Sequence, residues 1–313
     1  TYNTIYRITI RAIISTIGII SDILIIRTYL KSPFLVHQAH ALLGMMATNL
    51  SLQLLVVAVQ YHKKSKHTRC REMLITLFFL RPIVDAYRVS KNYKDDEAVT
   101  SHEFEYETNR LIELATESIP GCILQSYVWL TNRGRVGMFA LVSIGLSALS
   151  TGYGSALISF TLDTDAPHRS SQPSFYGYIP NSERERGRCL KLMTTISTLH
   201  NLSRSGGCAI LIAAGGKRLA TWVVGGEILL YFAYKIARGD FIYWVRVEGK
   251  SKYLVSLCSR LVGKVVVDFS GCLHFRHSKE LGGVAFSVSM VWAQVFPFVA
   301  IMLYNRGGGG ELG

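Results

Sequence analysis

The chain has 313 residues, with 34 Lys and Arg against 21 Asp and Glu, and therefore a formal net charge of +13. Charged residues make up only 18% of it, below the about 25% of soluble domains, and the mean hydropathy is +0.26. With 14 Phe, 16 Tyr and 4 Trp the chain is too apolar to be disordered, and six Cys are too few for a disulfide-stapled secreted domain. Sparse charge with a basic excess favours a membrane protein with basic loops over a nucleic-acid binder.

Eight apolar runs reach the length of about 20 helical residues that a membrane-spanning helix needs. In chain order they are residues 8–30, 40–61, 111–130, 136–162, 190–213, 219–236, 253–273 and 283–304. A ninth run, 73–87, is too short to cross comfortably and contains Arg81-Pro82, so we expect a re-entrant or interfacial helix there. The predicted fold is therefore all-α, a polytopic membrane helix bundle with about eight transmembrane helices and one short re-entrant helix.

Basic residues gather in four places, and these places predict the orientation. They are Arg7 with Arg11, residues 63–71, residues 169–191 and residues 235–252. With eight crossings all four fall on one side, which the positive-inside rule makes cytoplasmic. We therefore expect both termini in the cytoplasm and a single transmembrane domain over residues 1–306. The glycines at 307–313 predict a flexible end, and a start at Thr1 without an initiator Met suggests an excerpt of a longer protein.

Ionisable side chains inside the apolar runs are the main functional signal, because an isolated charge at the bilayer centre costs about 2.5–3.5 kcal/mol. Several are spaced four residues apart and so share one face of a helix. Three interpretations are open for them: a polar track through the membrane, internal salt bridges, or snorkelling at helix ends, for which Arg27 and Arg88 are the clearest candidates. The set consists of Asp22, Arg81, Asp85, Glu113, Glu117, Arg204, Glu227, Arg260, Lys264 and Asp268.

One of the apolar runs also carries a motif. Residues 111–130 read LIELATESIPGCILQSYVWL. This stretch resembles the signature helix of the XK-related family of phospholipid scramblases, with Gly121 and Cys122 in place of the usual Gln and Leu, as in a divergent member. Weaker similarities follow the same order along the chain at Ser21-Asp22, Leu80-Arg81, 143–159, Arg204 and 238–241. The matching positions of the signature helix are Glu113, Glu117, Pro120, Leu124 and Gln125.

The resemblance implies a plasma-membrane protein that moves phospholipids between leaflets without ATP, and that is not an enzyme. In this interpretation the arginines attract phosphate, while the carboxylates balance that charge and meet cationic headgroup atoms. Pro120 either kinks the helix beside the path or serves packing alone. The implied lipid-path residues are Asp22, Arg81, Asp85, Glu113, Glu117, Pro120, Gln125, Arg204, Arg260, Lys264 and Asp268.

Two other functions remain open. The charged residues could serve a secondary transporter or channel for small polar solutes, although we find no inverted repeat. The protein could also be a membrane anchor that docks a lipid-transfer partner through the polar segment 163–188. Small residues at 151–154 fit close helix packing better than an ion filter. The expected partners are membrane phospholipids and a single-span or lipid-transfer protein, with no nucleic acid, cofactor, metal or catalytic residue.

Overall fold

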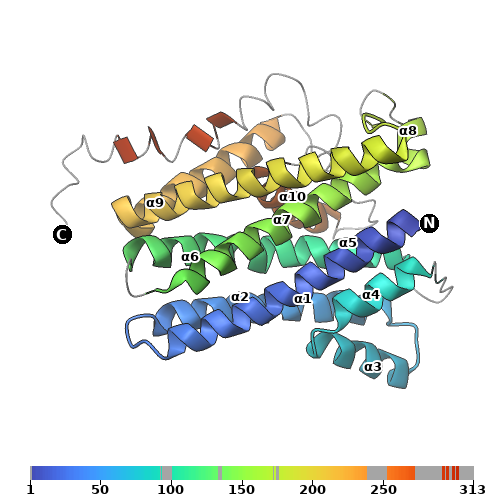
Figure 1. Cartoon of the computed structure of the whole chain (residues 1–313), viewed down its shortest axis with the longest axis horizontal. Coiled ribbons are helices and arrows are strands. Elements are labelled where there is room, and N and C mark those ends of the chain that lie inside the picture. Colours follow the sequence, from blue (N-terminus) through green and yellow to red (C-terminus); the bar gives the residue numbers. More distant parts are fainter. Residues whose placement is uncertain are drawn as a thin grey trace.

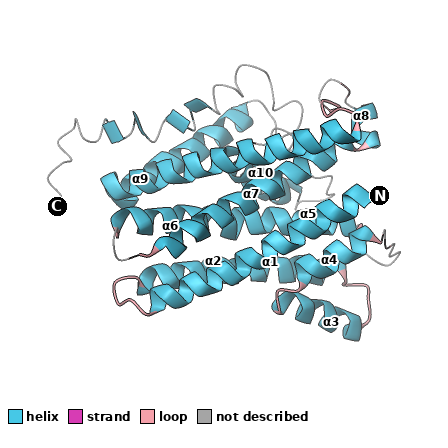
Figure 2. Cartoon of the chain, in the orientation of Figure 1, coloured by secondary structure: helices cyan, strands magenta, loops and turns pink. Residues whose placement is uncertain are grey.

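The computed structural model describes residues 2–91, 93, 101–132, 136–171, 173, 176–237 and 252–271, together with 291–292, 294–295, 298–299 and 301–302. Every regular element within these ranges is a helix (Figure 2). The longer helices run along the long axis of the molecule and form a bundle (Figure 1). Among the described residues, four helices are long and apolar enough to cross a membrane: Ile5–Leu30, Val36–Gln60, Met138–Thr164 and Glu183–Ala237.

These helices confirm an all-helical protein of membrane type. The count of about eight crossings remains a prediction. Most of the apolar run at 283–304 and all of the glycine-rich end at 307–313 lie outside the described residues. The assignment of residues 1–306 to one domain likewise remains a prediction.

The first two helices, α1 (Tyr2–Leu30) and α2 (Val36–Gln60), form an antiparallel pair joined by a short turn (Figure 1). Their inner faces meet α6 and α7 in a cluster that includes Ile25, Tyr29, Leu42 and Val128. Their outer faces still carry large apolar side chains, such as the exposed Ile13. A helix that is apolar on its outer face as well is typical of a membrane span.

The sequence predicts one short helix at 73–87. The structure has parts of two helices there. α3 (Lys66–Leu77) ends at residues 78–80, where Phe79 has a φ of 58°, and α4 (Arg81–Ser90) begins directly afterwards. Pro82 lies in the first turn of α4 and has no N–H to donate to a preceding turn, so α3 cannot continue through it. The prediction of a single short helix was wrong because Arg81-Pro82 begins a helix here.

The signature stretch forms one interrupted helix. α5 (His102–Glu113) is capped by Ser101, whose hydroxyl accepts from the Phe104 N–H at 3.3 Å. It continues into a π-helical segment, η1 (Leu114–Ser118), and then α6 (Ile119–Thr131). Pro120 cannot donate to the carbonyl of Thr116. The helix break expected at Pro120 therefore takes the form of a widened turn directly before it.

α7 (Met138–Thr164) packs closely against α9 (Glu183–Ala237) through small residues. A Cβ added to Gly152 would lie 2.7 Å from the backbone nitrogen of Thr198, so a larger residue would force the helices apart. Nearby, the hydroxyls of Ser155 and Ser197 are 2.9 Å apart. The prediction that residues 151–154 serve helix packing is confirmed.

α9 reverses direction at Gly216, whose φ of 72° and ψ of 174° are not helical. Arg204 and Glu227 form an ion pair across the two arms, although 23 residues of straight helix would separate them by about 34 Å. The arms, residues 183–215 and 217–237, correspond to the predicted runs 190–213 and 219–236 (Figure 1). α10 (Lys252–Ser270) packs against α9, and α8 (Ala166–Ser171) is a short helix after α7.

Three of the four basic clusters lie at one end of the bundle. Figure 1 places the N-terminus, helix α3 and helix α8 at the same end. These elements carry or adjoin the first three basic clusters. The fourth cluster, 235–252, is mostly outside the described residues. The cytoplasmic placement of these segments and of both termini remains a prediction.

Candidate functional site

Polar residues recur along one face of α1. Arg7, Arg11 and Ser15 are spaced four residues apart, and Asp22 follows two turns later. At a rise of about 1.5 Å per residue, this stretch covers about 22 Å of a hydrocarbon core that is about 30 Å thick. A polar face of this length can accompany a polar group through most of a membrane.

The polar face of α1 meets the signature helix residue by residue. The Arg11 guanidinium lies 4.2 Å above the ring of Tyr106, and the Ser15 hydroxyl donates to the Glu113 carboxylate at 3.1 Å. Deeper in, the Gln125 amide donates to Asp22 at 3.1 Å. The two segments run in the same direction, so their polar residues meet in the same order. We call this set the α1 ladder: Arg11, Ser15 and Asp22 with Tyr106, Arg110, Glu113, Glu117 and Gln125.

Neighbouring helices complete the middle of the ladder. Arg110 forms an ion pair with Glu113 and donates to the carbonyl and hydroxyl of Ser150 on α7, at 2.5 and 2.8 Å. Asn49 on α2 donates to Glu117, and both side chains are buried. The π-helical segment lies between Glu113 and the proline, and so it sets which way Glu117 points. Buried carboxylates with neutral or single cationic partners are the acceptors that a passing cation would meet.

A second group of charges lies beside the ladder. Arg81 is 1% exposed and donates to Glu72 at 2.9 Å and to Asp85 at 3.0 Å, and it also forms an ion pair with Glu105. Arg88 donates to Glu72 of α3 at 2.7 Å. The sequence suggested that Arg88 snorkels to the membrane surface, but its guanidinium binds this carboxylate instead. We call this group the Arg81 cluster: Tyr61, Glu72, Arg81, Asp85, Arg88 and Glu105.

The Arg81 cluster has the electrostatics of a structural salt-bridge network. Burial alone would raise the pKa of the Glu72 carboxyl, but hydrogen bonds and charge from Arg88, together with the charge of Arg81, hold it below its ordinary value. Three carboxylates use the donors of Arg81, so the guanidinium has little capacity left for a phosphate. For Arg81 and Asp85 this geometry supports the salt-bridge interpretation.

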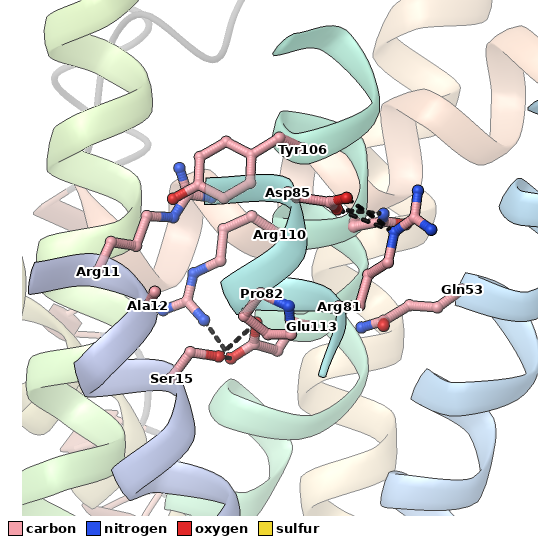
Figure 3. Close-up of a pocket in the computed structure, with 11 residues that line it drawn as sticks. Arg11, Ala12, Ser15, Gln53, Arg81, Pro82, Asp85, Tyr106, Arg110 and Glu113 are labelled. Atoms are coloured by element: carbon pink, nitrogen blue, oxygen red, sulfur yellow. Dashed lines mark hydrogen bonds and ion pairs between the residues drawn. The ribbon is translucent and has the colours of Figure 1, made fainter. Parts of the chain in front are cut away.

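A small cavity separates the ladder from the Arg81 cluster. Its volume is about 20 Å³, enough for the centre of a water molecule. In Figure 3, Arg11 and Arg81 lie on different sides of this cavity, with Arg110 and Glu113 between them. Dashed contacts join Arg81 to Asp85 and Glu113 to both Arg110 and Ser15 (Figure 3).

A third group of charges is built from α9 and α10. Arg204 pairs with Glu227 and lies 5.6 Å from the ring of Phe269, and Lys264 pairs with Asp268 one turn away. Arg260 is buried on the same helix as the last pair. An apolar cluster that includes Leu114 of η1, Cys208 of α9 and Val267 of α10 joins these helices to the signature helix.

A large cavity beside these groups is apolar and has a volume of about 720 Å³. Pro120, Ile123 and Leu124 line it from the signature helix, and Phe269 lines it from α10. His37 and Lys217 also line it, from the first turn of α2 and from the reversal of α9. A cavity of this kind suits an apolar chain with a polar end.

The structure thus separates the predicted lipid-path residues into three charged groups and the apolar cavity. Asp22, Glu113, Glu117 and Gln125 lie on the ladder. Arg81 and Asp85 lie in the Arg81 cluster, and Pro120 lines the apolar cavity. The third group contains Arg204, Arg260, Lys264 and Asp268. The assignment of all these residues to one lipid path remains a prediction, and the motif at 238–241 lies outside the described residues.

Several residues of the site were not predicted. Arg11 was assigned only to topology, and Glu105 and Arg110 lie just before the predicted apolar run at 111–130. The four-residue spacing of Arg7, Arg11 and Ser15 is a readable signal for the first of these. The capping serine at position 101 is a readable signal for the helix that carries the other two.

Comparison with known proteins adds one match. Residues 7–179, more than half of the chain, match the family model described as XK-related protein. The matched range contains the whole α1 ladder and the Arg81 cluster, and it ends before α9. No curated protein and no solved structure matches the chain.

Proposed function

Because the chain belongs to the XK-related family, we propose that it moves phospholipids between the two leaflets of a membrane without ATP. The observation that carries the proposal is the α1 ladder. Along α1, from Arg11 to Asp22, it offers polar partners over about 16 Å, which is about half of the depth of a hydrocarbon core. A headgroup that crosses this core needs its hydration replaced at each depth.

The ladder supplies partners of both signs. Arg11 and Arg110 suit the phosphate, while Glu113, Glu117 and Asp22 suit the amine or choline of a headgroup. The acyl chains would stay in lipid or in the apolar cavity beside Pro120, so only the headgroup has to pass polar groups. This is non-covalent transport, and it uses no nucleophile, cofactor or metal.

The wider expectations belong to the same proposal. They are a bundle of about eight crossings with one re-entrant element, residence in the plasma membrane, and both termini in the cytoplasm. The grouping of the basic segments at one end supports this orientation. A single-span or lipid-transfer protein is the proposed partner class, with the polar segment 163–188 as its contact.

The test is reconstitution of the full chain into vesicles that contain a trace of fluorescent phosphatidylcholine. A membrane-impermeant reductant added outside quenches the outer leaflet first. With protein and without ATP, we expect quenching to pass the outer-leaflet fraction and approach completion. Vesicles preloaded with a small fluorescent anion serve as the leak control.

Two outcomes would contradict the proposal. One is quenching that stops at the outer-leaflet fraction while the protein is folded and correctly inserted. The other is release of the trapped anion at the rate of lipid exchange, which would indicate a channel for small solutes.

A further inference from the structure

Arg11 is a buried guanidinium of the ladder, and the structure gives it few partners. It is 4% exposed, and its Nη2 has no hydrogen-bond partner among the described residues. Tyr106, whose ring lies against it, is 8% exposed, and its hydroxyl likewise has no partner there. A cation and a hydroxyl removed from water without acceptors are costly, so both groups have hydrogen-bonding capacity left for a ligand that supplies oxygens.

Both side chains line a second, larger cavity. It has a volume of about 260 Å³ and lies between α1, the end of α4, α5 and the end of α7. Arg7 and Thr164 line it as well, and so do the carboxylates Glu107 and Asp165. These helix ends lie at the end of the bundle where the N-terminus is found (Figure 1). The cavity therefore stands at the entrance of the ladder on the side of the basic segments.

The charges of this entrance cavity are mixed. Two guanidiniums and two carboxylates line one space of about 260 Å³. A simple anion would use the arginines and be repelled by the carboxylates. A ligand that joins a phosphate to an ammonium group would use both kinds of side chain.

We propose that the entrance cavity binds a phosphate-bearing zwitterionic headgroup. Its phosphate oxygens would accept from Arg11 Nη2 and the Tyr106 hydroxyl, and its ammonium would lie toward Glu107 and Asp165. The inference deepens the proposed function, on which it rests, by naming the substrate class and the residues that receive it. The headgroup can belong to a membrane lipid or to a soluble phosphodiester, and the experiment separates these two sources.

Binding is measured on the full chain in an uncharged maltoside detergent, from the rise of its thermal unfolding midpoint with added ligand. The probe is dihexanoyl phosphatidylcholine. Dihexanoyl phosphatidylglycerol lacks the ammonium, and dihexanoylglycerol lacks the whole headgroup. Glycerophosphocholine and inorganic phosphate carry the polar groups without acyl chains.

We expect phosphatidylcholine to raise the midpoint more than either of the other dihexanoyl compounds. Arg11→Gln should need about 10-fold or more phosphatidylcholine for the same rise, because a charged hydrogen bond is lost. Tyr106→Phe keeps the ring and should need about 2- to 10-fold more. The matched control is Arg27→Gln, which removes the same charge from an exposed position on the same helix and should respond like the wild type.

The outcomes that overturn the inference are distinct. An equal response of Arg11→Gln and Arg27→Gln excludes Arg11 as a ligand, and if Arg11→Gln does not fold, an unchanged response of Tyr106→Phe decides in the same way. Equal effects of phosphatidylglycerol and phosphatidylcholine contradict the zwitterionic class. If inorganic phosphate raises the unfolding midpoint as much as phosphatidylcholine does, the cavity binds a free anion and not a headgroup.

The soluble phosphodiester identifies the source of the ligand. Stabilisation by phosphatidylcholine at far lower concentration than by glycerophosphocholine indicates a membrane lipid, and equal concentrations indicate a soluble ligand. Lipid exchange in vesicles is measured separately. Exchange without Arg11-dependent binding would overturn this inference alone, while Arg11-dependent binding without exchange would overturn the proposed function alone.

Discussion

Arg11 and Arg81 both line one small cavity, lie on different sides of it and are nearly inaccessible to water, but their surroundings differ (Figure 3). Arg81 contacts three carboxylates from α3, α4 and α5. Arg11 lies on a tyrosine ring and has a nitrogen without a partner among the described residues. Burial of a charge in a membrane helix therefore does not by itself indicate function. The number of hydrogen-bond acceptors that the protein supplies to the arginine distinguishes a structural salt-bridge cluster from a binding site.

The two arrangements also differ in what they connect. The Arg81 cluster ties the short helices α3 and α4 to the start of α5, at the end of the bundle. The ladder runs along its interior and is contacted by α2 and α7. A saturated arginine fixes the position of its helices, whereas an arginine with spare donors can exchange one ligand for another.

The largest expected effect is on stability. Arg81→Gln leaves Glu72, Asp85 and Glu105 buried with one guanidinium fewer, so we expect a loss of about 3–5 kcal/mol in the free energy of unfolding. Thermal unfolding of the purified protein measures it. The control is Arg71→Gln, which removes an exposed partner of the same Glu72 and should cost less than about 1 kcal/mol. Equal losses of unfolding free energy in the two variants would contradict a stabilising role for the buried Arg81 salt bridges.

Arg11→Gln should have a much smaller effect on stability. The side chain loses its contact with the Tyr106 ring but leaves no carboxylate unpaired, so the change should stay within about 1 kcal/mol. The same unfolding measurement, without added lipid, compares it with Arg81→Gln. A loss as large as that of Arg81→Gln would show that both arginines are structural, and the comparison would fail.

The smallest effect is a dependence on pH. The pKa of Glu72 is lowered on folding, so its contribution to stability is present above the ordinary carboxyl pKa and is lost as pH falls through the folded value. We expect the difference in unfolding midpoint between wild type and Glu72→Gln to be constant near neutral pH and to shrink below about pH 4.3. A difference that does not change with pH would exclude an ionised Glu72 in the Arg81 cluster.

Much of the fold was readable from the sequence because apolar length alone defines it. The runs at 8–30 and 136–162 coincide with α1 and α7 to within several residues. The reversal at Gly216 falls between two predicted runs. Pairs within one helix, such as Arg81 with Asp85, were also predictable, since spacing of four residues places them on one face.

The rest depends on contacts between helices. Neither Asn49 beside Glu117 nor Glu105 beside Arg81 can be read from spacing, because the partners lie on different elements. The division of the run at 73–87 into two helices was not predicted. Pro82 was interpreted as an interruption of one helix, whereas it lies in the first turn of a new helix. The π-helical segment could not be placed from sequence, although the proline that follows it marks the region.

The central claim is that the α1 ladder carries headgroups, and one measurement tests it most directly. Lipid exchange is compared between vesicles that contain Glu117→Gln and vesicles that contain Glu185→Gln, an equivalent change at an exposed position near the start of α9. We predict at least about 10-fold slower exchange for Glu117→Gln, as expected when an interaction of about 1.4 kcal/mol is lost along the path. Equal exchange rates in two well-folded variants would contradict the claim.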